Sequence, residues 1–304
     1  MQELLESLRR WLERDEEVAL ATVVATRKSA PRPVGSVLGV TGTGELVGSV
    51  SAGCVENEVY AEARDVLAGG PARTLSYGIS DEQALGLGLP CGGEIDVFVA
   101  KAGAPLLRRA IEELEAGRVV TVRPVEDELE LVSRPAPRLV VVGAVDTAEA
   151  LCRGARALGW RTIVIDPRPR FATPERVPSA DELAVEWPDE ALERIGLDDG
   201  AAVVVLAHED RIDLPALASA LASDAFYVGV IGSRRTQAKR REGLAELGLG
   251  EETVSRLHGP VGLDVGAESP PETAVAILAE ILAVRSGRSG GSLRDRTGRI
   301  HAGV

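Results

Sequence analysis

The residues best suited to hold an anion follow two apolar runs in the second half of the chain. Gly143 ends the run of residues 139–143, and Gly232-Ser233-Arg234-Arg235 ends the run of residues 225–233. A helix is predicted to begin after each run, so free backbone N–H groups and the helix dipole would face a bound phosphate. The two arginines add charge-assisted hydrogen bonds. The sequence therefore predicts a phosphate site at Gly232–Arg235, with a serine cap and two solvated arginines as the alternative interpretation.

The first of these two turns departs from the dinucleotide-binding fingerprint. It reads Gly143-Ala144-Val145-Asp146-Thr147-Ala148, whereas the fingerprint is Gly-x-Gly-x-x-Gly/Ala. Val145 stands where bare backbone must approach a pyrophosphate. Asp146 either adds a negative charge at that point or caps the following helix. This turn predicts a nucleotide-binding type of fold with an altered phosphate loop.

Three more polar side chains fall near the ends of predicted strands. Asp166 lies close to the spacing of about 20 residues expected for a ribose-binding carboxylate, although an aspartate before Pro167 is also typical of a plain turn. Arg168 follows it. His208 ends the run of residues 201–208, and both a structural and a catalytic role stay open for it.

Two cysteines lie in glycine-flanked loops of the first half. Gly53-Cys54 precedes a predicted helix, whose dipole favours a thiolate while nearby acidic residues oppose it. Cys91-Gly92 lies in the Gly-rich segment 86–93. Purely structural thiols are the alternative to reactive ones. Cys152 falls in an Ala/Leu-rich helix and is expected in the core.

The strands and helices of the second half alternate. The predicted strands are 139–143, 161–169, 201–208 and 225–233, and the predicted helices are 147–158, 214–223, 235–248 and one that begins at a capping box, Ser269-Pro270-Pro271-Glu272. Apolar strands that alternate with helices indicate a parallel sheet covered on both faces. The fold class is therefore α/β, with a Rossmann-like C-terminal domain preceded by a smaller α+β domain.

The first half reads as that smaller α+β domain. Its predicted strands are 19–26, 35–41, 45–51, 74–78 and 93–100, with a hairpin turn at Gly42-Thr43-Gly44, and its predicted helices are 1–18, 55–67 and 104–117. A Pro-rich linker at residues 133–138 predicts the domain boundary. We expect domains at 1–135 and 136–287, followed by a flexible tail at 288–304.

Composition excludes several classes of protein. A formal net charge of −13 and only three each of Phe, Tyr and Trp argue against nucleic-acid binding. No apolar run is long enough to predict a membrane span, and the charged N-terminus lacks a signal core. Three cysteines without a C-x-x-C pattern argue against a disulfide framework and structural zinc. We therefore expect a cytoplasmic protein.

Taken in order, the motifs resemble the XdhC/CoxI family of accessory proteins for molybdenum hydroxylases such as xanthine and carbon monoxide dehydrogenases. The resemblance covers nearly the whole chain up to the tail. It rests on Ser29–Ser36, Gly48–Glu56, Cys91–Gly93, Gly143-Ala144, Asp166–Arg168, Gly232–Arg235, Gly262–Ala267 and Pro270–Glu272. Many family members carry Gly-His where this chain has Val145-Asp146.

The resemblance implies a chaperone that binds finished molybdenum cofactor, often as a molybdopterin dinucleotide, and delivers it to an apo-hydroxylase. Some members assist sulfuration, so cofactor-maturation proteins are expected partners, and a homodimer stays open. No catalytic residue is implied. The expected cofactor-binding residues are Gly53, Cys54, Cys91, Gly92, Gly143, Asp166, Arg168, His208, Gly232, Ser233, Arg234 and Arg235. Cys54 or Cys91 would contact molybdenum, since a thiolate suits a soft metal centre.

Two other functions stay open on the sequence. An NAD(P)-dependent oxidoreductase is favoured by the fold and by Asp166, whereas Val145 and the lack of a Tyr-x-x-x-Lys pattern argue against it. A thiol-based sulfur carrier for cofactor sulfuration is favoured by Cys54 and Cys91. Whether the chain is an enzyme therefore stays open, with the chaperone role preferred.

Overall fold

The computed structural model describes residues 2–27, 30–78, 93–116, 118, 120–122, 131–133, 135–295 and 297. The chain forms two compact units. The first unit comprises Met1–Pro135 with Leu293–Val304, and the second comprises Ala136–Ser292.

The first unit is built on an antiparallel sheet with the strand order β3-β2-β1-β5-β4. The strands are β1 (Val18–Arg27), β2 (Val37–Thr41), β3 (Leu46–Gly48), β4 (Arg73–Tyr77) and β5 (Glu94–Ala102). Antiparallel pairing of β2 with β3 confirms the hairpin predicted at Gly42-Thr43-Gly44. A separate pair, β6 (Val120–Val122) and β7 (Leu131–Ser133), is also antiparallel.

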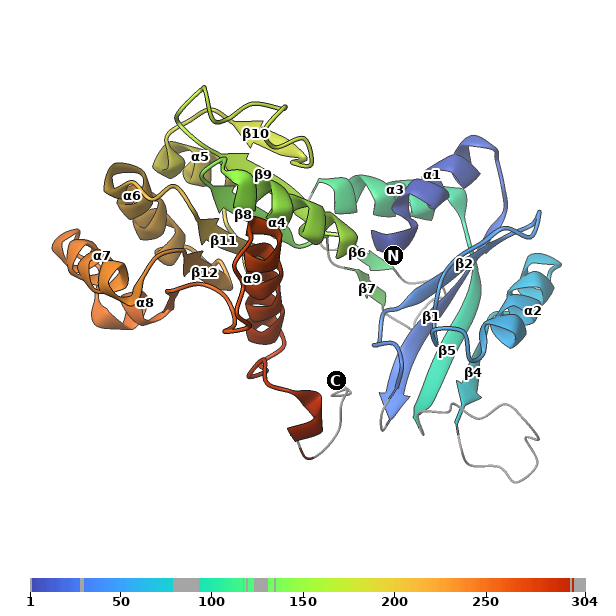
Figure 1. The fold of residues 1–304 in the computed structure, drawn as a ribbon. Coiled ribbons are helices and arrows are strands. Elements are labelled where there is room, and N and C mark those ends of the chain that lie inside the picture. Colours follow the sequence, from blue (N-terminus) through green and yellow to red (C-terminus); the bar gives the residue numbers. More distant parts are fainter. Residues whose placement is uncertain are drawn as a thin grey trace. The chain divides into compact units, whose positions relative to one another are not determined.

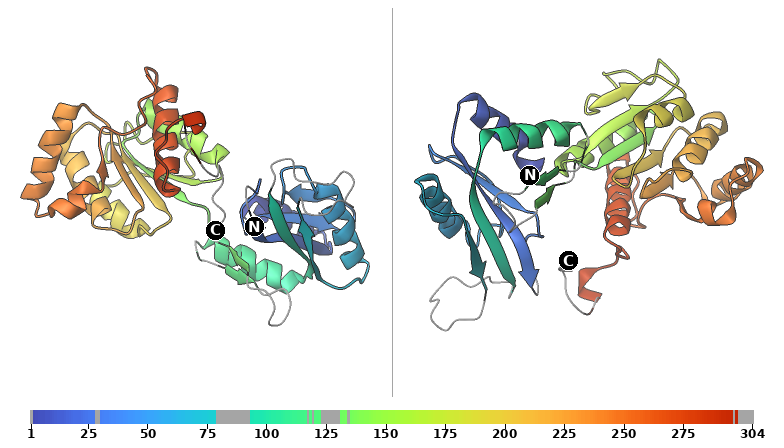
Figure 2. Two further views of the ribbon diagram at one scale, coloured as in Figure 1. Left: turned by 90° about the horizontal axis from the view of Figure 1, so that it is seen from below. Right: turned by 180° about the vertical axis from the view of Figure 1, so that it is seen from behind.

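Helices cover both faces of this sheet (Figure 2). They are η1 (Gln2–Leu4), α1 (Leu5–Glu13), α2 (Glu56–Leu67) and α3 (Ala104–Glu115), and a short η2 (Leu293–Asp295) comes later in the chain. The α2 side chains Val59 and Ala63 pack with alternate residues of β1, whereas Trp11 of α1 and Leu107 of α3 pack on the opposite face. The period of two along β1 thus sends apolar side chains into two small cores.

The second unit contains a parallel sheet with the order β10-β9-β8-β11-β12-β13. Its strands are β8 (Arg138–Val142), β9 (Arg161–Ile165), β10 (Glu182–Ala184), β11 (Ala201–Val205), β12 (Tyr227–Val230) and β13 (Leu257–His258). The chain begins in the middle of the sheet at β8, builds outward through β9 and β10, and then crosses to β11. This order is that of a doubly wound nucleotide-binding domain, with the switch point between β8 and β11.

Helices pack on both faces of the parallel sheet (Figure 1). They are α4 (Asp146–Ala157), α5 (Pro188–Ile195), α6 (Asp210–Leu221), α7 (Arg234–Glu246), α8 (Glu251–Ser255) and α9 (Pro270–Arg285). The helices α4 and α9 share one apolar core with alternate strand residues, and α5, α6, α7 and α8 share the other. The prediction of a Rossmann-like C-terminal domain, preceded in the sequence by a smaller α+β domain, is confirmed.

Some local predictions need correction. The short elements β10, α5, α8 and β13 are not among those predicted. The helix predicted to begin at Leu214 begins at Asp210, so Pro215 lies inside it. Packing of Ile212 and Ala216 in the core stabilises this extra turn against the loss of a proline N–H. The capping box at Ser269 and Glu272 is confirmed. Within the described part of the chain, no helix is both long and apolar enough to cross a membrane.

Candidate functional site

The turn after β8 requires glycine at its first position. Gly143 has a φ of +108°, and a Cβ atom added there would lie 2.8 Å from the backbone nitrogen of Ala207 on the neighbouring strand end. This contact is too short for any side chain. The first glycine of the altered fingerprint is thus explained by close approach of two backbones at the switch point.

Asp166, at the end of β9, braces this turn from within. The residue is fully buried, and its carboxylate accepts the Ala144 N–H at 2.9 Å. Arg168 donates from Nε at 2.9 Å and from Nη2 at 2.7 Å, and its backbone N–H also donates at 2.9 Å. Both carboxylate oxygens therefore already hold internal donors, so the structure places Asp166 as the support of the loop.

The electrostatics of this pair favour its charged form. Burial alone would raise the pKa of the Asp166 carboxyl, but the hydrogen bonds from Arg168 and Ala144 outweigh burial and lower that pKa. The hydrogen bond to Asp166 in turn raises the pKa of Arg168. Arg168 also donates to Glu209 at 2.6 Å, which joins the loops after β9 and β11. The Arg168 guanidinium thus links the ends of β9 and β11, and the Asp166 carboxylate links the end of β9 to the turn after β8.

The interpretation of Asp146 as a helix cap is wrong. The N-cap of α4 is Val145, and no side chain within the described residues caps that end. Asp146 is the first helical residue, with its side chain 84% exposed and one oxygen 3.4 Å from Arg176. It still lies in the first turn, where a negative charge interacts favourably with the helix dipole.

His208 follows β11 in an unusual conformation. Its φ is +59°, a left-handed value that residues other than glycine rarely adopt, and the residue is exposed. Such conformations are found preferentially at functional sites, where the surrounding structure enforces them. The structure therefore places His208 in solvent at the same sheet edge as Gly143 and Arg168.

The turn after β12 has the serine cap and the two exposed arginines of the alternative interpretation. Ser233 caps α7 by accepting the Thr236 N–H at 3.2 Å. Arg234 and Arg235 are exposed, and no ion pair within the described residues engages them. Two exposed guanidinium groups at a helix N-terminus leave this turn able to attract a phosphate.

A buried ion pair beneath this turn was not among the features predicted from the sequence. Arg240 is 3% exposed and donates to the fully buried Asp213 of α6 and to the Ile231 carbonyl. A Cβ atom on Gly232 would lie 2.9 Å from the Arg240 guanidinium. Hence Gly232, with a φ of +136°, allows the arginine to support the loop. The signal available in the sequence was a charged residue at a core position of each helix.

The loop before α2 in the first unit wraps around Glu56. Six donors converge on this one carboxylate. They are the hydroxyls of Ser49 and Ser51 and the backbone N–H groups of Val50, Ser51, Gly53 and Val55. Cys54 is half-buried in this loop. The two residues before it, Ala52 and Gly53, have left-handed φ values of +58° and +107°. In the sequence Glu56 stands out only as a charge near the thiol, although an acidic residue in a first helical turn is a known capping signal.

Of the other two cysteines, the structure describes only Cys152. Cys91 and Gly92 lie outside the described residues. Cys152 is fully buried, as expected for a core residue, and burial raises the pKa of its thiol to about 12. Across the described parts of the chain, no group of three or more His, Cys, Asp or Glu side chains could hold a metal ion.

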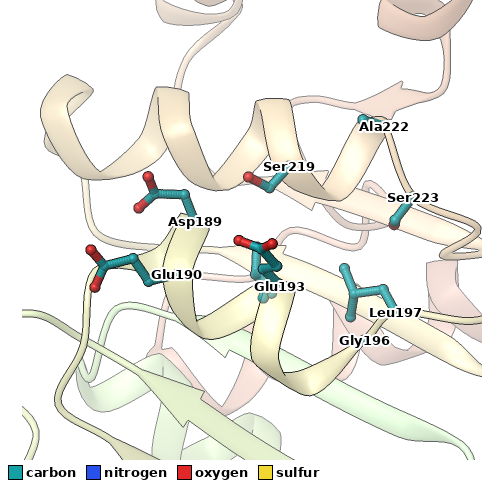
Figure 3. A pocket seen from close by; sticks show the side chains of 9 residues that line it. Asp189, Glu190, Glu193, Gly196, Leu197, Ser219, Ala222 and Ser223 are labelled. Carbon is teal, nitrogen blue, oxygen red and sulfur yellow. The ribbon is translucent and has the colours of Figure 1, made fainter.

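A groove between α5 and α6 differs from the strand-end region in charge (Figure 3). Its volume is about 420 Å³, and Asp189, Glu190 and Glu193 are among its lining residues. None of the described residues that line it is basic. Three carboxylates repel a phosphate, so this groove does not suit a phosphate-bearing ligand.

Comparisons with known proteins connect both units to one family. Residues 139–281 match the family profile described as XdhC Rossmann domain, and residues 11–78 match the one described as XdhC and CoxI family. The chain is 30% identical over 286 residues to the molybdenum cofactor insertion chaperone PaoD of Escherichia coli (strain K12). The matched region covers 88% of this chain and 83% of PaoD. It is 28% identical over 321 residues to a probable xanthine dehydrogenase component of Bacillus subtilis (strain 168), covering 90% of this chain and 95% of that protein.

A solved structure also shares the fold. A protein described as a xanthine dehydrogenase from Bacillus halodurans matches with a TM-score of 0.75 at 24% sequence identity, covering 95% of this chain and 98% of that chain. At this identity the likeness concerns the fold alone.

Proposed function

The chain belongs to the XdhC and CoxI family, and on that premise we propose that it binds molybdenum cofactor and delivers it to an apo-hydroxylase of the xanthine or carbon monoxide dehydrogenase type. The observation that carries this proposal is the similarity to a molybdenum cofactor insertion chaperone over most of both chains. The cargo is proposed to be a molybdopterin dinucleotide. Its molybdenum arrives with the cargo, so the chain itself needs no resident metal.

The exposed groups of both units suit the parts of such a cargo. Arg234 and Arg235 present exposed positive charge at the start of α7, where a phosphate would receive charge-assisted hydrogen bonds. Cys54 offers a half-buried thiol on a braced loop, and sulfur is a suitable ligand for a soft metal centre. His208 at the sheet edge adds a further polar contact. In each unit, these groups suit the binding of a ligand, and none of them is proposed to make or break bonds on an organic substrate.

The same proposal implies the partners of the chain and its compartment. The partners are a molybdenum hydroxylase and the proteins that mature its cofactor, and the compartment is the cytoplasm. The alternative as an NAD(P)-dependent oxidoreductase is weakened by Asp166, because its two oxygens are engaged by Arg168 and Ala144. Titration with NAD(H) and with NADP(H) discriminates between the two, since micromolar binding of either coenzyme would favour the oxidoreductase.

The direct test is cofactor loading of a client hydroxylase. The hydroxylase is expressed with the chain, without it, and with the Arg234→Ala/Arg235→Ala variant, and the molybdenum and nucleotide content of the purified enzyme is measured. We expect full loading only with the unaltered chain. A fully loaded, active hydroxylase in the absence of the chain would refute the proposal.

A further inference from the structure

A pocket of about 410 Å³ opens where three strands of the second unit end. We term it the arginine pocket. It is lined by residues that follow β9 (Pro167, Arg168, Arg170 and Phe171), by Trp187 after β10 and by Arg211 at the start of α6, together with neighbouring residues. Ligands of doubly wound folds bind beyond the carboxyl ends of the strands. Its volume lies at the lower end of the range for small-molecule sites, about 300–1,000 Å³. The pocket is therefore placed and sized for one half of a dinucleotide.

The apolar part of the pocket presents an exposed aromatic surface. Phe171 is already covered by the Arg168 guanidinium, 4.0 Å from the ring centroid. Trp187, by contrast, is 45% exposed. An exposed indole beside a concave wall is unusual in a chain that carries few aromatic side chains. A planar base can stack on such a ring with little cost in side-chain entropy.

The charged part of the pocket carries an excess of positive charge. Arg168 is balanced by Asp166 and Glu209, and Arg211 donates to Glu209 at 2.8 Å. Arg170 is exposed, and no ion pair to it is formed among the residues that the structure describes. Three guanidinium groups thus face two carboxylates, on a chain whose formal net charge is −13. This local excess favours an anionic ligand.

We infer that the arginine pocket binds the nucleotide half of the cargo, with its base against Trp187 and the nucleotide's own phosphate at Arg170, while the phosphate of the pterin half is the one proposed for Arg234 and Arg235. The inference rests on the proposed function and deepens it, because it implies a cofactor that carries a nucleotide. Asp166 is occupied by Arg168, so recognition depends on the base and the phosphate rather than on a carboxylate bound to ribose. The acidic groove between α5 and α6 has a similar volume but the wrong charge (Figure 3).

The test is calorimetric titration of the full chain with CMP, GMP and AMP, with the matching nucleosides, and with inorganic phosphate. We expect at least one monophosphate to bind, and its nucleoside and free phosphate to bind at least about tenfold more weakly. Trp187→Ala and Arg170→Ala should each weaken the monophosphate about tenfold. Arg153→Ala, which removes a side chain 63% exposed on α4, is the matched control and should leave the affinity unchanged.

The outcomes separate this inference from the proposed function. No binding of any monophosphate, or affinities unaltered in both pocket variants, overturns the pocket, while a chain that still loads a hydroxylase keeps its chaperone role. If nucleotide binding depends on Trp187 and Arg170 but the chain loads no hydroxylase, the inferred nucleotide site is supported and the proposed chaperone function is refuted. Competition by NADPH at micromolar concentration would identify a nicotinamide coenzyme as the source of the nucleotide instead.

Discussion

Replacing Glu56 by Gln should loosen the loop that contains Cys54. The carboxylate accepts hydrogen bonds from six donors, all from residues 49–55. A glutamine amide offers one oxygen and an NH₂ group that faces other donors, so several donors lose their acceptor. Glu58→Gln is the matched control, because Glu58 lies in the same helical turn and its carboxylate accepts no hydrogen bond within the described residues.

The size of the effect follows from the charge of the bound carboxylate. Burial alone would raise the pKa of Glu56, but hydrogen bonds from Ser51, Ser49 and the backbone outweigh burial and lower the pKa from 4.5 to about 2. At about 1.4 kcal/mol for each unit of pKa, this difference corresponds to about 3 kcal/mol. The side chain is only partly buried, so solvent screening reduces the expected loss in unfolding free energy to about 1–2 kcal/mol.

The assay is urea unfolding of both variants as a function of pH. Because the pKa of Glu56 is lower in the folded state, its contribution is complete above the ordinary value of 4.5 and is lost as the pH falls toward about 2. The stability gap between the unaltered chain and Glu56→Gln should therefore be constant at neutral pH and narrow in acid. A gap that persists unchanged near pH 3, or an equal loss in Glu58→Gln, would show that the six hydrogen bonds do not act through the charge.

Three further changes test the second unit. Gly143→Ala should lower its unfolding free energy by about 2 kcal/mol or more, measured by urea unfolding, because the new Cβ would lie 2.8 Å from a backbone nitrogen. Arg240→Met should cost about 3–5 kcal/mol in the same assay, because it leaves the Asp213 carboxylate buried without its partner. Arg234→Ala with Arg235→Ala should weaken cofactor binding more than tenfold, at about 1.5–3 kcal/mol for each lost contact, with unfolding unchanged.

Two of these changes have a control in the same unit. Gly159 has a φ of +72° with open space around its Cβ position, so Gly159→Ala should cost less than Gly143→Ala. Lys239→Ala removes an exposed cation from α7 away from its first turn and should leave cofactor affinity unaltered. An equal loss of unfolding free energy in both glycine variants would contradict the steric explanation for Gly143. An equal loss of cofactor affinity with Lys239→Ala would contradict a specific phosphate contact at Arg234 and Arg235.

The sequence by itself determined the fold class of the second unit and most of its longer strands and helices. Apolar strands with β-branched residues, helices with a period of 3.6 and a capping box at Ser269 are local signals, each carried by residues a few positions apart. The same holds for Gly143, whose place after a buried strand already indicated a tight turn. The strands that the sequence did not reveal, β10 and β13, contain two or three residues and carry too little pattern to be recognised.

The tertiary structure alone decided how the site residues are used. Asp166 could serve a ribose or the protein itself, and the choice depended on Ala144, 22 residues before it, and on Arg168 turning back toward it. Similarly, Asp213 and Arg240 are 27 residues apart and meet only because α6 and α7 pack on one face of the sheet. The arginine pocket requires the ends of β9, β10 and β11 to converge. Such contacts follow from strand order and packing, which no local pattern of residues encodes.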